Sequence, residues 1–471
     1  MKENDADNIP TLEFDRGTLR VTGFQKDALD SIAPELPWEW DSRDSSFRTD
    51  ALYYSHFKHC LRKLFAGTLN DSIPQWQEVR WGEINIHALR DEQVSAVEAW
   101  ELVKQGCVVM PTGTGKTEVA LSIMSRNPVS TLIVSPVRDL MYQWHRRILN
   151  ALGVDAGIVG DNVFKVLPVS VTTYDSAYIH MPLLGNRFEM IIFDECHHLP
   201  GLSRSEAALM SAAPMRLGLT ATLERADGRH ELLDRLIGPV CYDLGLKQVR
   251  GRSVADYEVV RIPVHLSDEE RQRYDDLSQQ VRRYMMKRRE ETPSFSWEDL
   301  CSDVASTQEA RQVLRAFYAK RAIEDRATEK LRVLEDLFRL HAGQPCLVFA
   351  GSNAMAREVS CRFLIPCLLN HCGKSERIEV LEGLEAGRYP AIVANQVLDE
   401  GVDLPQVNVA IVIGGGGSTR QAKQRLGRVL RRGSGAPAIL YEIVTEDTNE
   451  VQRSRKRRKN DAYEGTRHRR I

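Results

Sequence analysis

The stretch Met110–Thr117 (MPTGTGKT) limits what this chain can fold into more strongly than any other part of it. It follows the apolar residues Cys107–Val109 and precedes a helical pattern. Gly113 and Gly115 allow the backbone to curl, so that several N–H groups point to one spot. An apolar strand, a tight glycine turn and a helix N-terminus are together typical of a loop that holds nucleotide phosphates.

The residues of this loop have distinct expected roles. Lys116 can reach the terminal phosphates, and the hydroxyl of Thr117 can ligate Mg²⁺. Met110 stands where the usual motif has glycine, so a strand–helix turn that binds nothing is the alternative. The residues expected to surround the phosphates are Pro111, Thr112, Gly113, Thr114, Gly115, Lys116 and Thr117.

A second motif, Ile191–Pro200 (IIFDECHHLP), removes that alternative. Its apolar strand delivers Asp194 and Glu195 to the strand's C-terminal end. A Mg²⁺ ligand and a carboxylate that orients the attacking water belong at such a position, and we assign Asp194 and Glu195 to these roles. A phosphate loop with an acid pair at a strand end predicts a nucleoside-triphosphate hydrolase.

Composition sets wider bounds. The chain has 471 residues, of which 42% are hydrophobic and 27% charged, as in ordinary globular proteins of several domains. The nine cysteines form no CxxC pair, which favours buried free thiols over a metal site. No long apolar run or signal peptide is visible, so we expect a cytoplasmic protein without membrane contact. The net charge of −2 means that any nucleic-acid binding must come from local basic surfaces.

Short apolar strands alternate with helical patterns in two blocks of the chain. Such alternation predicts an α/β fold with parallel sheets and ligands at the carboxyl ends of the strands. The expected strands are 107–110, 131–135, 169–172, 190–193 and 216–220 in the first block, and 345–350, 391–394, 407–412 and 438–443 in the second.

The remaining segments differ from these blocks in their residue pattern. Residues 1–85 predict a small separate domain with strands near 11–24 and 38–48 and a helix at 52–65. Charged helical patterns without a strand fill 251–324 and predict an inserted helical arm. Residues 453–470 hold nine Lys or Arg against two acids, which is typical of a solvated disordered tail or of a tail that touches nucleic acid. The expected boundaries are 1–85, 86–250, 251–324, 325–450 and 451–471.

Three arginines in the second block, Arg425, Arg428 and Arg431, follow one another at spacings of three. Arg428 and Arg431 would share one helical face. Two guanidinium groups supplied by another domain can neutralise charge on a departing γ-phosphate. An exposed basic helix is the alternative when the segment is taken alone.

With these motifs in order, the chain resembles the superfamily 2 helicases, and most closely the XPB family of DNA translocases. The resemblance covers about residues 35–450. It implies two RecA-like domains that close on ATP and Mg²⁺, a helical thumb, and 3′→5′ movement on single-stranded or duplex DNA. The pathway that the resemblance implies is DNA repair. The motifs that carry it are LR–Q (89–93), MPTGTGKT, VSPVRDLMYQW (134–144), TTYDSAY (172–178), DECHH, LGLTAT (217–222), NQVLDEGVDLP (395–405) and QRLGRVLRR (424–432).

The resemblance also implies roles for individual residues. Arg90 and Gln93 would contact the adenine, and Gly401 and Asp403 would face the nucleotide. Gln424, Arg428 and Arg431 would act in catalysis, with the two arginines as arginine fingers. The residues expected to contact DNA are Arg138, Thr172, Thr173, Tyr174, Arg225, Asp227 and Asn395.

Two features keep other interpretations open. Where the family has an Arg-Glu-Asp triplet implicated in opening duplex, this chain has Arg225, Ala226 and Asp227. An ATP-gated DNA clamp that separates no strands therefore remains an alternative, as does the motor subunit of a restriction or defence complex with a partner nuclease. The segment around Trp40, Asp41 and Arg43 resembles the family's damage-recognition domain, although a small packing domain with a surface ion pair explains it equally well.

Overall fold

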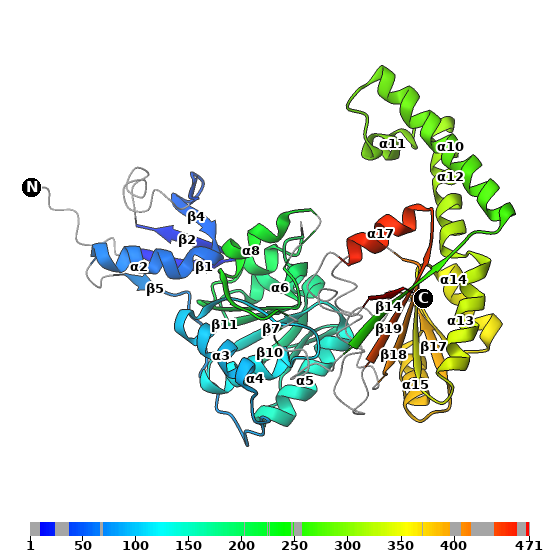
Figure 1. Cartoon of the computed structure of the whole chain (residues 1–471). Coiled ribbons are helices and arrows are strands. Elements are labelled where there is room, and N and C mark those ends of the chain that lie inside the picture. The colour runs from blue at the N-terminus through cyan, green and yellow to red at the C-terminus, as the bar shows by residue number, and fades with distance from the viewer. Residues whose placement is uncertain are drawn as a thin grey trace, which may run out of the picture. The chain divides into compact units, whose positions relative to one another are not determined.

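The computed structural model describes residues 10–23, 37–65, 69–201, 203–223, 225, 227–245, 248, 257–369, 371–395, 407–415, 438–458 and 468–470. The chain forms two compact units, Met1–Gly245 and Leu246–Ile471, which are described separately (Figure 1). Over these ranges, no helix combines the length and apolar character needed to cross a membrane.

An eight-stranded sheet forms the centre of the first unit, with the order β13-β6-β12-β11-β7-β10-β8-β9. All neighbouring strands are parallel except the hairpin pair β8 and β9. The five strands expected from the sequence are present. The bounds are β6 Gln105–Val109, β7 Thr131–Ser135, β8 Gly157–Gly160, β9 Val163–Lys165, β10 Val169–Thr173, β11 Met190–Asp194, β12 Met215–Thr220 and β13 Val240–Asp243.

Helices cover both faces of this sheet. Every residue of β7, β10 and β11 is buried, as in a parallel sheet with two covered faces. Ile191 and Phe193 face one core together with residues of α6, α7 and α8. The helices are α3 Asp91–Val103, α4 Lys116–Arg126, α5 Arg138–Leu152, α6 Tyr174–Leu184, α7 Glu206–Leu209 and α8 Leu232–Leu236, with short 3₁₀ turns η2 Cys196–His198 and η3 Arg229–Glu231.

A small mixed sheet, β3-β4-β2-β1-β5, lies in the same compact unit. Its core includes Ala212 of the larger sheet domain, and the Asn186 side chain donates to the Ile73 carbonyl over 3.0 Å. The bounds are β1 Thr11–Asp15, β2 Thr18–Thr22, β3 Glu39–Asp41, β4 Ser46–Asp50, η1 Ala51–Tyr53, α2 Tyr54–Phe65 and β5 Asn70–Asp71.

The two tryptophans of this small domain pack against its core. The Trp38 ring lies 4.1 Å from Phe57 and the Trp40 ring 4.7 Å from Phe47, measured between centroids. Arg43 pairs with Asp41 at 2.6 Å. These contacts favour the packing interpretation of the Trp40 segment over a base-stacking one.

The second unit contains a parallel seven-stranded sheet, β16-β17-β15-β18-β19-β14-β20. Helices α13 Thr328–Leu340, α14 Asn353–Phe363, α15 Lys374–Glu385 and α17 Asn449–Arg457 accompany it. The strands are β14 Tyr257–Val264, β15 Cys346–Ala350, β16 Cys367–Leu368, β17 Ala391–Ala394, β18 Val409–Ile413, β19 Ala438–Thr445 and β20 His468–Arg470.

Strand β14 differs from the expectation that 251–324 holds no strand. Its eight residues pair with β19 from Tyr257 to Val264, so this sheet begins before the helical arm. The sequence pattern does not indicate this strand, because Glu258, Arg261 and Pro263 interrupt its apolar residues. The arm is therefore inserted after the first strand of the second sheet.

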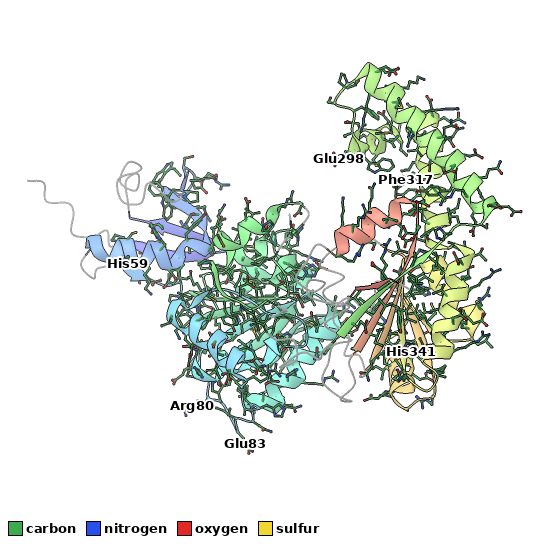
Figure 2. All side chains as sticks on the ribbon, viewed as in Figure 1. His59, Arg80, Glu83, Glu298, Phe317 and His341 are labelled. Carbon is green, nitrogen blue, oxygen red and sulfur yellow. The ribbon has the colours of Figure 1, made fainter. Side chains whose placement is uncertain are left out.

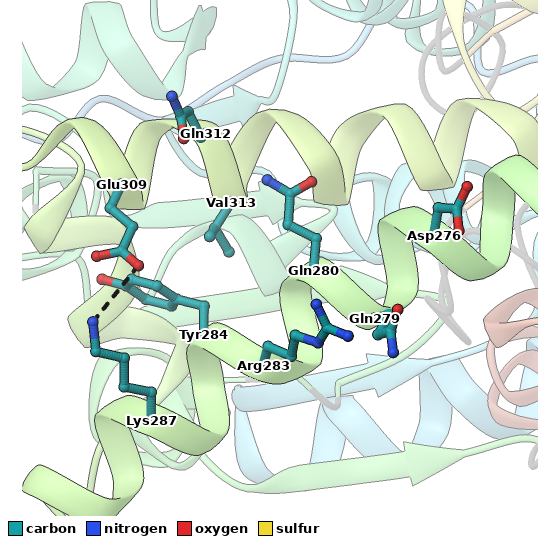
Figure 3. A pocket seen from close by; sticks show the side chains of 9 residues that line it. All are labelled: Asp276, Gln279, Gln280, Arg283, Tyr284, Lys287, Glu309, Gln312 and Val313. Atoms are coloured by element: carbon teal, nitrogen blue, oxygen red, sulfur yellow. Dashed lines mark ion pairs between the residues drawn. The ribbon is translucent and has the colours of Figure 1, made fainter.

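The inserted arm consists of α10 Asp268–Glu291, α11 Trp297–Asp303 and α12 Gln308–Asp325. Ser267 and Glu270 form a capping box at the start of α10, which satisfies two free N–H groups. Trp297 packs on Phe317 with ring centroids 4.3 Å apart. Phe317 is labelled on the arm in Figure 2. Between α10 and α12 lies a polar pocket of about 370 Å³, where Lys287 and Glu309 approach to 3.9 Å (Figure 3).

The expected basic tail from residue 451 begins inside α17, which is part of the fold. Glu450 and Ser454 are fully buried, and Arg453 pairs with the buried Glu324 at 2.7 Å. The sequence pattern did not indicate this role, because the inward contacts of Glu450, Arg453 and Ser454 are made by polar groups and not by an apolar stripe. Residues 449–458 therefore stabilise the second unit.

Candidate ATP-hydrolysis site

The phosphate loop connects β6 to α4 at the carboxyl edge of the first sheet. Met110 is fully buried, and its N–H donates to the Thr220 carbonyl of the neighbouring strand β12 over 2.9 Å. Gly113 and Gly115 have positive φ angles of 86° and 82°, whereas Met110 is not among the residues with positive φ. Glycine is thus required at 113 and 115 but not at 110, which explains the departure from the usual motif.

Arg90 and Gln93 brace this loop from the start of α3. Gln93 Nε2 donates to the Thr114 carbonyl over 2.9 Å, and the Arg90 guanidinium donates to the same oxygen. A Cβ atom at Gly115 would lie 2.3 Å from Gln93 Nε2, so the two segments touch. Contact of Arg90 and Gln93 with adenine remains a prediction.

The loop carries polar groups suited to phosphate oxygens. Lys116 Nζ donates to the Met110 carbonyl over 3.2 Å, which folds the ammonium back over the loop. The Thr112 hydroxyl is buried without a hydrogen-bond partner among the described residues. A phosphate oxygen in the curl of the loop would supply that missing partner. The loop therefore fits a nucleotide.

The acid pair stands two strands away, because β12 separates β6 from β11. Asp194 is buried, accepts a hydrogen bond of 2.9 Å from Trp144 Nε1 and one of 3.0 Å from the Glu195 N–H. Burial and the nearby Glu195 charge raise the pKa of Asp194 to about 6, against the opposing effects of Trp144 and Lys116. A cation beside this carboxylate would favour its ionised form.

Asp194 and Thr117 offer the carboxylate and hydroxyl oxygens that Mg²⁺ prefers. In the described ranges, no group of three or more His, Cys, Asp or Glu side chains could hold a metal ion. Mg²⁺ at nucleotide sites takes most of its ligands from phosphates and water, so a site with only two protein ligands suits it.

Three residues expected to contact DNA are instead turned into the protein. Tyr174 is fully buried and its hydroxyl donates to the Asp194 carbonyl over 3.0 Å. Thr172 is also fully buried and donates to the Val159 carbonyl, while the Thr173 side chain caps α6 by accepting from the Ser176 N–H. Thr172 and Tyr174 are buried because β10 lies between β7 and β8 under covering helices, and DNA contact by these residues stays a prediction.

The other expected DNA contacts differ in accessibility. The Arg138 side chain is 69% exposed and pairs with Asp161 at 2.6 Å. In the second unit, Asn395 donates to the Asn353 side chain over 2.8 Å. Arg225 and Asp227 form an ion pair beside the acid motif, with a closest distance of 2.7 Å. DNA contact by these four residues stays a prediction. The expected site residues Gly401, Asp403, Gln424, Arg428 and Arg431, together with Arg425 and Ala226, lie outside the described residues.

Two residues of the site were not singled out in the sequence. Trp144 lies in the VSPVRDLMYQW motif, but only the fold brings it to Asp194. His197 lies in DECHH, and its fully buried ring contacts Thr220. The motifs contained both residues without indicating these partners.

A phosphate loop and an acid pair on one parallel sheet, followed in the chain by a second parallel sheet, define a phosphate-loop NTPase with a helicase-type fold. The crystal structure of the Pyrococcus furiosus Hef helicase domain is similar, with a TM-score of 0.53, 14% identity and coverage of 77% of this chain and 97% of that one. Within this class, a family model for the ERCC3/RAD25/XPB C-terminal helicase matches residues 306–468. A model for the res subunit of type III restriction enzymes matches residues 86–225.

Sequence relatives identify the family. The chain is 42% identical over 371 residues to the DNA 3′-5′ translocase XPB2 of Sulfurisphaera tokodaii, covering 79% of this chain and 84% of the relative. It is 30% identical over 378 residues to the DNA 3′-5′ helicase XPB of Kineococcus radiotolerans, covering 77% of this chain and 61% of the relative. The chain belongs to the XPB family.

Proposed function

We propose that this protein is an ATP-dependent DNA motor that moves 3′→5′ and opens or remodels duplex DNA. The observation that carries the proposal is the phosphate loop and the buried, hydrogen-bonded Asp194 on one sheet edge. The names of the relatives, a DNA 3′-5′ translocase and a DNA 3′-5′ helicase, support DNA as the substrate and the direction of movement.

In the proposed chemistry, the loop N–H groups and Lys116 bind the β- and γ-phosphates. Thr117 and Asp194 would hold Mg²⁺, which when bound supplies positive charge to the phosphate oxygens. Glu195 orients the attacking water, and preorganised donors stabilise the developing charge. We assign Arg428 and Arg431 to the arginine-finger role on the basis of the family motif.

The test is the rate of ATP hydrolysis without nucleic acid and with single-stranded DNA, duplex DNA, forked DNA or RNA. We expect DNA to stimulate hydrolysis and RNA to do so less. Lys116→Ala serves as the control that separates this protein's activity from a contaminant. Equal stimulation by RNA and DNA would contradict the DNA assignment, and no nucleotide hydrolysis under any condition would overturn the proposal.

A second candidate is a motor subunit in a restriction or defence complex, working with a nuclease or with repair proteins. The match of residues 86–225 to the res subunit of type III restriction enzymes favours it. The motor chemistry would be the same for both candidates, so the identity of the partner protein distinguishes them. Co-purification with a nuclease whose DNA cleavage depends on ATP would support this candidate. A cytoplasmic, nucleoid-associated location follows from either proposal.

A third candidate is an ATP-gated clamp with little strand separation, which the Ala226 substitution keeps open. Strand displacement and DNA-stimulated hydrolysis, measured on the same preparation, separate clamp from helicase. An Ala226→Glu variant that displaces more strand per ATP would indicate that position 226 limits opening.

A further inference from the structure

We infer that Arg225 is a positioning residue for Glu195, because its guanidinium braces the turn that carries this carboxylate. The inference rests on the proposed ATPase function and on contacts within the first compact unit. The family resemblance links the Arg225–Asp227 segment to DNA opening. The contacts of Arg225, however, connect it to His197 and Glu195 in the hydrolysis site.

The backbone at Glu195 needs support. Glu195 has φ 47° and ψ 54°, a left-handed conformation that is unfavourable for a residue with a side chain. The following turn η2 holds it, since the His198 N–H donates to the Glu195 carbonyl over 3.0 Å. The Glu195 N–H donates to Asp194 Oδ1 over 3.0 Å. The direction of the Glu195 carboxylate therefore depends on the geometry of this turn.

His197, in the middle of the turn, connects it to the LGLTAT motif (217–222). Its buried Nδ1 lies 3.0 Å from Thr220 Oγ1 and 3.4 Å from Glu195 Oε2. The Thr220 hydroxyl donates to the Thr222 carbonyl over 2.7 Å, so its oxygen accepts a hydrogen bond from Nδ1 of His197. This network assigns a proton to Nδ1 of the His197 ring. The His197 N–H thus lies between a fixed hydroxyl and the Glu195 carboxylate.

Arg225 holds the backbone of the same histidine. Arg225 Nη1 donates to the His197 carbonyl over 2.6 Å. Its Nε and Nη2 donate to the two carboxylate oxygens of Asp227 over 2.9 Å and 2.7 Å. All three nitrogens of the guanidinium are engaged, and such a bidentate pair fixes the plane of the group.

These contacts form one chain from the segment after the LGLTAT motif to the carboxylate expected to orient the attacking water. Asp227 orients Arg225, Arg225 fixes the His197 carbonyl, and His197 contacts Glu195. Asp227 is 43% exposed, so DNA that approached this segment could change the ion pair between Arg225 and Asp227. Movement of this segment would then alter the position of Glu195 and the rate of hydrolysis.

The test compares Arg225→Ala with Arg229→Ala for ATP hydrolysis without DNA and with saturating DNA. Arg229 lies in the same segment and is exposed, so it is the matched loss of one positive charge. For Arg225→Ala we expect kcat to fall about 10-fold or more in both conditions, while KM for ATP changes less than about twofold. Arg225→Lys should recover part of kcat, because an ammonium can still donate to the His197 carbonyl. Arg229→Ala should keep the DNA-free rate.

An unchanged DNA-free rate in Arg225→Ala, with only the DNA-stimulated rate lowered, would overturn the inference in favour of a DNA contact. A parallel rise in KM would overturn it as well. If Arg225→Ala is unfolded, the same comparison is made with Arg225→Lys and Asp227→Asn, which should both lower the DNA-free kcat. Hydrolysis by the wild type that is lost in Glu195→Gln secures the proposed function independently, so an unaltered Arg225 variant would then count against this inference alone.

Discussion

Trp144 donates a hydrogen bond of 2.9 Å from its indole nitrogen to Asp194 Oδ2, and both side chains are buried. Burial raises the pKa of Asp194 to about 6, and this hydrogen bond acts against that rise. The indole therefore helps to keep the carboxylate ionised and fixes the position of its Oδ2 atom. Such a donor stabilises a charged acceptor by about 1.5–3 kcal/mol.

The first prediction concerns this donor. Trp144→Phe should raise the Mg²⁺ concentration needed for half-maximal ATP hydrolysis by about 10-fold or more, because the lost hydrogen bond contributes about 1.5–3 kcal/mol. Trp100→Phe is the matched control, because the Trp100 indole is also buried but donates to the Arg216 carbonyl over 2.9 Å. A Mg²⁺ titration in which both variants shift equally would show that Trp144 has no special role at Asp194.

The second prediction concerns the acid pair and the loop. Lys116→Ala should lose most ATP turnover together with nucleotide affinity, because the ammonium belongs to the phosphate loop. Glu195→Gln should lose turnover by about 10²–10⁴-fold, the usual contribution of a general base, yet still bind ATP. Binding is measured with a fluorescent ATP analogue and turnover by phosphate release. Wild-type turnover in Glu195→Gln would remove this residue from the water-orienting role.

The motifs predicted the site's strands because apolar runs of four to six residues between glycines and charged segments are readable locally. Its internal contacts could not be predicted. The Trp144–Asp194 and Tyr174–Asp194 hydrogen bonds join residues 50 and 20 positions apart in the chain. Thr172 is expected to contact DNA because it lies in a motif that contacts nucleic acid in the family. Its burial could not be predicted, because it depends on the strands beside β10. Strand β14 was missed because its charged residues and proline resemble the neighbouring helical arm more than a buried strand.

The third prediction concerns the expected arginine fingers. Arg428→Ala and Arg431→Ala should each lower kcat, by up to about 10³-fold if they stabilise the transferring phosphoryl group. Nucleotide affinity should fall less, because charge on the γ-phosphate develops in the transition state. Single-turnover hydrolysis and nucleotide binding, measured on the same variants, give the two quantities. Equal losses in both would make the arginines ground-state ligands.

The fourth prediction concerns Lys330 and Glu450, which form a fully buried ion pair at 2.7 Å in the second unit. Burial would raise the pKa of Glu450, but the Lys330 charge and hydrogen bonds outweigh it, and the pKa lies below its ordinary value of 4.5. A lowered pKa means stability that is present above the unfolded-state value and lost as pH falls through the folded-state value. Lys330→Met should therefore destabilise the second unit at neutral pH by about 3–5 kcal/mol.

Urea unfolding followed by hydrogen exchange in β19 and α17 measures this effect. Lys330→Met/Glu450→Leu is the control, because replacing both charges with apolar groups removes the unpaired carboxylate and should recover much of the loss. Equal stability of the single and double variants would contradict the proposed cost of an unpaired Glu450.

The last prediction concerns the exposed basic face of α17. Arg455 and Lys456 are exposed, whereas Arg453 is committed to the buried Glu324. Arg455→Gln/Lys456→Gln should weaken DNA binding at low salt and reduce the slope of log affinity against log salt by up to about 1.8, since two fewer counterions are released. Hydrolysis at saturating DNA should stay unchanged. Arg453→Gln should instead destabilise the second unit, because it leaves Glu324 buried without its cation. An unaltered salt slope in the double variant would mean that this face of α17 does not touch DNA.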